Sequence, residues 1–286
     1  MLKGGELEVI RISVIIPTLN EETTIGCTML ALERQKFRDF ETIVVDGGST
    51  DRTCEILRRY NARIIPIDRA GIARAQNIGH TYASGEILVF TQADTKPPTD
   101  WLTKIANEFS KDKALIAITG PLEVPSDAPT WMQIEYRLWN IIRWICNLFP
   151  PPLGMFFTSG PNIAVRRWAF EKIGGFDEYL PVHEDGTLGK MLAALGKTKF
   201  CGPFYMPLSV IVSPRRGKLG FKGMNRHYAY ILGDLFPFNI LLPHSIWERI
   251  RIHTWIDLLR DRNLSEVEIT KRIATMQRRN KEYSPA

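Results

Sequence analysis

The sequence has few cysteines and no long apolar run. Its four cysteines are scattered along 286 residues without a Cys-x-x-Cys pair, which argues against a disulfide framework and a cysteine-ligated zinc site. The most apolar region, residues 138–157, contains Arg143 and three consecutive prolines. It therefore falls short of the roughly 20 apolar residues that a membrane-spanning helix needs. We expect reduced thiols and no transmembrane helix.

A secretory signal and the common nucleotide-binding loops are also missing. Four charged residues, at positions 3, 6, 8 and 11, stand where a signal peptide would have its apolar stretch, so we expect a cytoplasmic protein. The first predicted strand is not followed by a Gly-x-Gly-x-x-Gly turn, and no P-loop pattern occurs. These absences argue against a dinucleotide-binding Rossmann domain and a P-loop protein.

The charge of the chain is concentrated near its C-terminus. Residues 215–286 contain 14 Lys and Arg against 7 Asp and Glu, so this segment carries +7 and the other 214 residues sum to −1. A basic tail on a near-neutral body indicates an anionic partner such as a phosphate, a nucleic acid or an acidic membrane surface. A solvated basic helix has the same composition, so the charge alone does not choose among them.

Short apolar runs rich in β-branched residues alternate with helical segments over the first 120 residues. The runs predict strands at 12–16, 42–45, 62–67, 86–90 and 115–119. This alternation predicts an α/β fold with a mainly parallel sheet, and the continuous apolar runs indicate strands covered on both faces. Helices are expected at 21–34, 54–60, 101–109 and 186–195, with Asn20, Thr50 or Asp51, and Thr99 as candidate N-caps of the first three.

The segment 131–149 predicts an unusual amphipathic helix. Its polar residues recur every three or four positions along one face, while large apolar residues, three tryptophans among them, fill the rest. This pattern fits a helix at a membrane interface or beside an apolar groove, and it fits a core helix equally well. The polar residues are Gln133, Arg137, Asn140, Arg143 and Asn147.

Polar segments follow three of the predicted strands, at 17–22, 46–51 and 91–95. The carboxyl ends of parallel strands open onto a ligand crevice, so these segments are expected to converge there. Gly47 and Gly48 allow backbone to approach a ligand closely, and the Asp46 carboxylate can accept hydrogen bonds from a base or ribose. Each segment alone also fits ordinary turn and capping chemistry, but their joint occurrence favours a ligand site.

Six short motifs in a fixed order resemble family 2 glycosyltransferases, which have the GT-A nucleotide-sugar-binding fold. They lie at 13–22, 44–51, 74–79, 92–94, 174–178 and 183–185. The resemblance covers about residues 13–217. It implies a GT-A domain at 10–214, with a nucleotide-sugar half at about 10–120 and an acceptor half at 121–214. A basic helical C-terminal extension at 215–286 is expected to follow.

The resemblance implies a set of donor-binding residues and a divalent cation, Mg²⁺ or Mn²⁺. Asp94 matches the last acid of the family's Asp-x-Asp motif, which binds the cation at the donor diphosphate. The first acid is replaced by Gln92, which carries no charge, so the arginines of the loop 213–217 would supply part of the neutralisation. The implied donor-binding residues are Pro17, Thr18, Asn20, Glu21, Asp46, Gly48, Arg74, Gln92, Arg215 and Arg216.

The resemblance also implies a catalytic base and an acceptor side. Asp185 would deprotonate the acceptor hydroxyl, which attacks the anomeric carbon with inversion of configuration; alternatively its carboxylate caps the helix expected at 186–195. Glu184 or His183 would orient the acceptor, and Asn162 matches the family's acceptor-side loop. The Gln-x-x-Arg-Trp motif of processive members is missing, so a single sugar transfer is expected.

Together these features predict transfer from a UDP- or GDP-sugar to a hydroxyl or phosphate on a membrane-associated acceptor, with the protein bound peripherally to the cytoplasmic face. One alternative is a dolichyl- or polyprenyl-phosphate sugar synthase. Another is a catalytically silent nucleotide-sugar-binding module, for which Gln92 is the cue. Nucleic-acid binding by the tail lacks a recognised motif, so no nucleic-acid partner is expected.

Overall fold

The computed structural model describes residues 10–68, 71–147, 156–178, 184–202 and 208–214. All of these except Glu178, Glu184 and Pro214 belong to one compact unit. The predicted extension at 215–286 lies outside the described residues, as do His183, Arg215 and Arg216.

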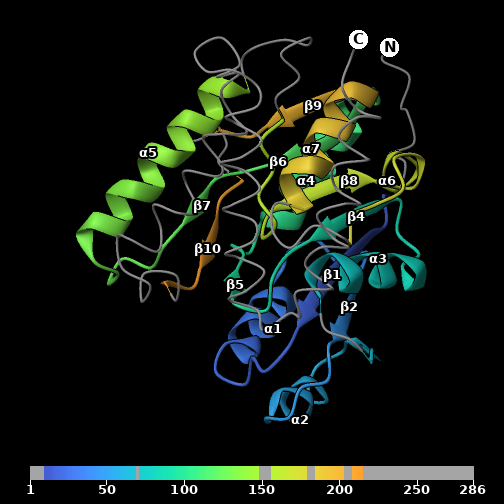
Figure 1. Cartoon of the computed structure of the whole chain (residues 1–286), viewed down its shortest axis with the longest axis vertical. Helices are drawn as coiled ribbons and strands as arrows, with labels where there is room; N and C mark the ends of the chain where they lie inside the picture. The colour runs from blue at the N-terminus through green and yellow to red at the C-terminus, as the bar shows by residue number, and fades with distance from the viewer. Residues whose placement is uncertain (1–9, 69–70, 148–155, 179–183, 203–207, 215–286) are drawn as a thin grey trace, which may run out of the picture. The chain divides into compact units, whose positions relative to one another are not determined.

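A seven-stranded sheet with the order β3-β2-β1-β4-β8-β6-β9 forms the centre of this unit (Figure 1). Neighbouring strands are parallel except β8, which is antiparallel to both β4 and β6. The predicted mainly parallel α/β sheet is therefore confirmed. The strands are β1 (Ile12–Thr18), β2 (Phe40–Asp46), β3 (Arg63–Pro66), β4 (Ile87–Phe90), β6 (Leu115–Thr119), β8 (Ile163–Arg166) and β9 (Lys197–Phe200).

Helices cover both faces of the sheet, which explains the continuous apolar runs. Successive side chains of a strand point to opposite faces. Accordingly, Val14 of β1 packs in a core cluster with Trp101, whereas Ile15 packs in another cluster with Ala73 and Phe170. The helices are α1 (Ile25–Glu33), α2 (Thr53–Leu57), α3 (Ile72–Tyr82), α4 (Trp101–Lys111), α6 (Arg167–Lys172) and α7 (Glu184–Leu195).

The predicted N-caps were wrong. Helix α1 begins at Ile25 rather than at residue 21, and its N-cap Thr24 makes no side-chain capping bond. The N-caps of α2 and α4 are Arg52 and Asp100, each one residue after a predicted cap. Asn20 has a left-handed backbone with φ of 54°. Its side chain binds the loop after β2 instead, as described below.

A small second sheet with the order β5-β10-β7 lies beside the main one. Its strands are β5 (Thr95–Lys96), β7 (Leu122–Glu123) and β10 (Val210–Val212). Helix α5 (Thr130–Cys146) runs beside β7 (Figure 1). No helix in the part of the chain described above is long and apolar enough to cross a membrane.

Two polar side chains of α5, those of Asn140 and Arg143, point into the protein, whereas Arg137 is exposed. Asn140 and Arg143 are 5% and 1% exposed. The Asn140 amide donates to the Leu122 carbonyl at 2.8 Å and accepts from the Leu122 N–H at 3.1 Å. Apolar side chains on the other side of α5 are 37–56% exposed, and we call them the outer stripe. The outer stripe consists of Trp131, Ile134, Leu138, Ile142 and Ile145.

Candidate functional site

The carboxyl ends of β2, β1 and β4 lie side by side, because these parallel strands are neighbours in the sheet. Thr18, the last residue of β1, is paired with Asp46, the last residue of β2. The Gly47 N–H donates to the Thr18 carbonyl at 2.9 Å. The sequence-predicted polar segments after these three strands therefore start at one edge of the sheet.

Asn20 ties the loop after β1 to the loop after β2. Its N–H donates to Ser49 Oγ at 2.9 Å, and its side-chain oxygen accepts from the Thr50 N–H at 2.8 Å. A left-handed backbone is uncommon outside glycine, although asparagine adopts it more readily than most residues. The two bonds compensate for this conformation and hold both loops in register.

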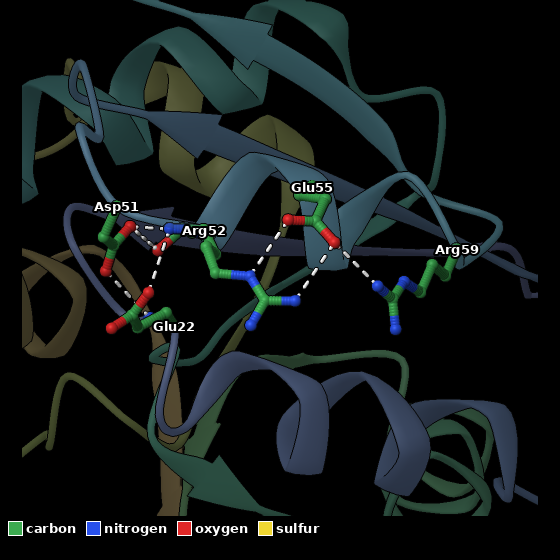
Figure 2. Close-up of polar contacts among 6 residues, drawn as sticks. Glu22, Asp51, Arg52, Glu55 and Arg59 are labelled. Carbon is green, nitrogen blue, oxygen red and sulfur yellow. Dashed lines mark hydrogen bonds and ion pairs between the residues drawn. The ribbon is translucent and has the colours of Figure 1, made fainter.

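A second set of contacts fastens the same loops at the surface (Figure 2). The Glu22 N–H donates to Asp51 Oδ2 at 3.1 Å, and the Arg52 N–H donates to Glu22 Oε2 at 3.0 Å. Arg52 also pairs with Glu55 at 3.0 Å, and Glu55 pairs with Arg59 at 2.7 Å. Exposed ion pairs contribute little stability, so the main-chain bonds of Glu22 and Arg52 are the more useful part of this network.

Asp46 shapes its own loop. Asp46 is buried, with 4% of its surface exposed. Its Oδ2 accepts hydrogen bonds from the N–H groups of Gly48 at 3.2 Å and Ser49 at 3.0 Å. Gly48 has φ of 91°, and nothing lies within 4 Å of the position where its Cβ would stand. Thr18 Oγ1 is buried and has no hydrogen-bond partner among the described residues. The loop thus offers a ligand open backbone, and the neighbouring end of β1 has a hydroxyl without a partner among the described residues.

Arg74 lies in the first turn of α3, which follows β3. Its guanidinium binds Asp68 at 3.0 Å, while its Nε is buried without a hydrogen-bond partner in the described ranges. Three residues further on, the Asn77 amide donates to the Phe176 carbonyl and accepts from the Phe176 N–H, both at 2.9 Å. This reciprocal pair connects the motifs at 74–79 and 174–178.

The segment carrying Gln92 and Asp94 follows β4 and leads directly into β5. Both side chains are partly exposed. The buried Thr28 hydroxyl donates to the Ala93 carbonyl at 2.8 Å and so anchors the segment to α1. The Ser213 N–H donates to the Asp94 carbonyl at 3.1 Å. Strand β10 therefore brings the start of the predicted arginine loop, 213–217, next to Asp94.

Gly160 brings Gln92 and Asp185 close together. A methyl group at its Cβ position would lie 3.3 Å from Gln92 Nε2 and 3.8 Å from Asp185 Oδ2. The Gly160 N–H donates to Asp185 Oδ2 at 2.9 Å. The motif at 92–94 and the acid of the acceptor half thus meet at a glycine, and a side chain there would crowd Gln92. The sequence offered no signal for Gly160 beyond its place in the segment 159–162.

Asp185 does not precede its helix. Helix α7 begins at Glu184, so Asp185 lies in the first helical turn, and its Oδ1 accepts from the neighbouring Gly186 N–H at 2.8 Å. The Thr158 hydroxyl donates to the Asp185 main-chain carbonyl. Acidic side chains are favourable in the first turn of a helix, so Asp185 is well placed there.

Asn162 is buried, with 1% of its surface exposed. Its side-chain oxygen accepts from Trp101 Nε1 at 3.1 Å, and its Nδ2 donates to the carbonyls of Pro121 at 3.2 Å and Leu208 at 2.5 Å. These bonds occupy the amide within the protein. Asn162 therefore supports the segment that contains Gly160. The sequence had instead suggested that Asn162 contacts the acceptor directly.

The residues around Asp94 fit a divalent cation that takes most of its coordinating atoms from a bound ligand rather than from the protein. Among the described residues, no group of three or more His, Cys, Asp or Glu side chains forms a metal site. Asp94 offers one carboxylate, and Gln92 lies two residues before it. Mg²⁺ is commonly bound by one or two carboxylates together with substrate phosphates and waters, so this donor set is compatible with a cation that arrives with a diphosphate.

Comparison with known proteins adds relatives over much of the chain. A probable glycosyltransferase of Bacillus subtilis, YdaM, is 28% identical over 188 residues, covering 60% of this chain and 44% of that protein. A PGL/p-HBAD biosynthesis glycosyltransferase of Mycobacterium tuberculosis is 38% identical over 167 residues, covering 54% and 64%. The chain spans about half the length of the curated relatives that it matches.

Two solved structures share the fold. The mannosyltransferase PcManGT of Pyrobaculum calidifontis, in complex with GDP-Man and Mn²⁺, matches with a TM-score of 0.61 and 22% identity over 97% of this chain and 76% of that chain. TarS of S. aureus, in complex with UDP-GlcNAc, matches with a TM-score of 0.57 and 15% identity over 88% and 81%. The predicted GT-A fold is confirmed. The model of the family described as Glycosyl transferase family 2 matches residues 13–174, more than half of the chain. This chain therefore belongs to glycosyl transferase family 2.

Proposed function

We propose that this protein transfers a single sugar from a nucleoside diphosphate sugar to a hydroxyl or phosphate of an acceptor, with inversion of configuration. The observation that carries the proposal is the meeting of Gln92 and Asp185 at Gly160. A group held between the donor motif and this carboxylate would have a base on one side and the diphosphate site on the other.

The donor is proposed to lie along the carboxyl edge of β1, β2 and β4. Its nucleoside would contact the loops at 17–21 and 46–48, a role supported by the unpartnered Thr18 hydroxyl and the open space beside Gly48. Its diphosphate would lie near Arg74 and Gln92. Arg215 and Arg216 would add positive charge; their own positions are outside the described residues, and the bond from Ser213 to Asp94 supports this role.

A divalent cation, Mg²⁺ or Mn²⁺, would be held by Asp94 and by phosphate oxygens of the donor. When bound, it supplies positive charge that stabilises the departing diphosphate. The support is the partly exposed carboxylate after β4 and the Mn²⁺ in the structure of the Pyrobaculum mannosyltransferase. Because Gln92 adds no charge, the protein itself would bind the cation weakly without the donor.

Asp185 is proposed as the general base. As the acceptor oxygen forms its bond to the anomeric carbon, its proton passes to the Asp185 carboxylate. The bond from that carbon to the diphosphate oxygen breaks, and its electron pair leaves on the nucleoside diphosphate. Attack opposite the leaving group inverts the configuration. Glu184 would contact the acceptor, and Asn162 would hold the segment beneath it.

Calorimetric titration with UDP, GDP, UDP-GlcNAc and GDP-mannose, each with Mg²⁺, Mn²⁺ or EDTA, tests the donor site. We expect one nucleotide to bind only with a metal, and Asp94→Ala to weaken that binding by about tenfold or more, since a charged ligand is lost. Asp112→Ala is the matched control, because Asp112 pairs with Lys197 on β9. Absence of nucleotide binding under every condition would contradict the proposal and favour a silent module.

Release of nucleoside diphosphate without acceptor tests the base. Water would then take the acceptor's place, and we expect Asp185→Asn to slow release by about a hundredfold, in line with general-base catalysis. Nucleotide affinity should stay near that of the wild type. Equal release by the variant and the wild type would exclude Asp185 as the base.

We propose further that the acceptor is membrane-associated and that the protein binds peripherally to the cytoplasmic face of the membrane. The support is the outer stripe of α5, whose apolar side chains are exposed while Asn140 and Arg143 on the other side of the helix are buried. Apolar insertion and the +7 charge of residues 215–286 would act together on an anionic leaflet. A lipid phosphate acceptor, as in a polyprenyl-phosphate sugar synthase, fits the same surface.

Co-sedimentation with vesicles of phosphatidylcholine, alone or mixed with phosphatidylglycerol, tests this part. We expect binding to the mixed vesicles, and a loss of about tenfold or more in Ile134→Asn/Leu138→Asn, since each variant side chain gives up apolar burial. Trp168→Asn is the control, because Trp168 is 50% exposed but lies on α6. Equal binding by both variants would contradict a role for the outer stripe.

A further inference from the structure

Arg143 is a buried cation on the inner face of α5. It is 1% exposed, and desolvation lowers the pKa of its guanidinium to about 10. None of the ion pairs between described residues includes Arg143, and its Nε has no hydrogen-bond partner among them. A buried charge is costly, and an apolar side chain of similar volume would avoid that cost.

The guanidinium of Arg143 donates hydrogen bonds to two segments of the chain. Its Nη2 donates to the Phe157 carbonyl at 3.0 Å and to Thr119 Oγ1 at 3.3 Å. Its Nη1 donates to the Gly120 carbonyl at 3.4 Å, and its carbon Cζ lies 4.9 Å from the centre of the Phe200 ring. Arg143 thus joins the end of β6 to the segment that begins at Phe157.

The segment that starts at Phe157 is the one that holds Asp185. Thr158 donates its hydroxyl to the Asp185 carbonyl, and the Gly160 N–H donates to the Asp185 carboxylate at 2.9 Å. One side of the segment is therefore bound by a buried guanidinium and the other by Asp185. The two charges also interact, because the field of the Asp185 carboxylate raises the pKa of Arg143 and so opposes the effect of burial.

We propose that Arg143 is a positioning residue for Asp185. It anchors the segment 157–160 on the side away from Asp185, so that Thr158 and Gly160 hold the carboxylate toward Gln92 in one orientation. The inference rests on the proposed function, in which Asp185 is the base. It adds that the chemistry depends on a side chain that touches neither the base nor the substrates.

Arg166 provides a matched control. It donates from Nε to the Leu115 carbonyl at 2.8 Å and from Nη2 to the Phe109 carbonyl at 3.0 Å, and it lies 5.2 Å over the Phe109 ring. Its contacts thus resemble those of Arg143, but it stands at the end of β8 away from Gly160. Loss of either arginine should destabilise the fold, whereas only Arg143 should affect Asp185.

The first experiment measures nucleoside diphosphate release from UDP-GlcNAc and GDP-mannose with Mn²⁺, using the full chain. We expect Arg143→Met to lower kcat by about tenfold or more, because misplacing a reacting group is costly, with donor KM and nucleotide affinity within about twofold of the wild type. Arg143→Lys should restore part of kcat, and Arg166→Met should leave it unchanged. An unchanged kcat in Arg143→Met, or an equal loss of donor binding, would overturn the proposal.

The second experiment does not depend on activity. A double-mutant cycle in urea compares Asp185→Asn in the wild-type and Arg143→Met backgrounds. We expect the effect of Asp185→Asn on the unfolding equilibrium constant to differ by about fivefold or more between them, as for residues coupled through shared partners. The same cycle with Arg166→Met should show no coupling. Independent effects of Arg143→Met and Asp185→Asn would refute the positioning role, whereas absent nucleotide binding with intact coupling would refute only the proposed function.

Discussion

Replacing Asn162 by alanine should measurably lower the free energy of unfolding, because Asn162 holds the segment that contains Gly160 in place. The variant removes three hydrogen bonds of a side chain that is 1% exposed. The Pro121 carbonyl keeps a bond from the Val210 N–H at 3.2 Å. The variant therefore leaves two buried groups without their bond to Asn162, namely Trp101 Nε1 and the Leu208 carbonyl. At about 1–3 kcal/mol for each of these two buried groups, we expect a loss of about 2–6 kcal/mol in the free energy of unfolding.

Urea unfolding followed by circular dichroism measures this loss without relying on the fluorescence of Trp101. Trp101→Phe is the control, because it removes one bond of Asn162 and leaves its two donations in place. It should cost less than Asn162→Ala. A loss below about 1 kcal/mol for Asn162→Ala would refute the view that the amide is committed to the core. Asn162 would then be free for the acceptor contact that the sequence suggested.

Three further predictions concern stability. Gly189→Ala should lower the free energy of unfolding by about 1–3 kcal/mol, because its Cβ would stand 2.0 Å from a main-chain oxygen. Gly26→Ala, with nothing closer than 3.6 Å to its Cβ, should raise the free energy of unfolding by up to about 1 kcal/mol. Chemical denaturation measures both. Asn77→Ala should cost about 1–2 kcal/mol in the same assay, through its two lost bonds to Phe176. Burial raises the pKa of the Cys201 thiol from 9.0 to about 12, so the unfolded chain loses its proton first and stability should fall as pH rises across that window. Cys201→Ala should flatten this part of the pH profile, and an unchanged slope would contradict the assignment.

The strands near the donor site were predictable because β1, β2 and β4 are buried on both faces. That burial demands continuous apolar runs, which are visible in one sequence. The strands β5 and β7 have two residues each and β10 has three, too few for any period to show. The place of β8 between β4 and β6 follows from its pairing with both, a long-range property that local sequence does not carry.

The orientation of α5 shows a different limit. The spacing of the five polar residues from Gln133 to Asn147 predicts that one face is polar, and the usual rule would turn that face toward water, as it does for Arg137. Here the main chain at Gly120, Leu122 and Phe157 needs partners, and Asn140 and Arg143 supply them. The apolar face is left outside for this reason.

By itself the sequence determined the family, the α/β sheet and the chemistry-bearing segments at its carboxyl edge, since composition, periodicity and short motifs are local properties of a chain. Only the tertiary structure decided which of these segments meet. Gln92, Gly160 and Asp185 are far apart in the chain, and they converge because β8 returns antiparallel beside β4 and α7 begins next to the segment that leads into β8. That convergence depends on the paths of long connections and on buried bonds such as those of Arg143 and Asn162, which no local pattern encodes.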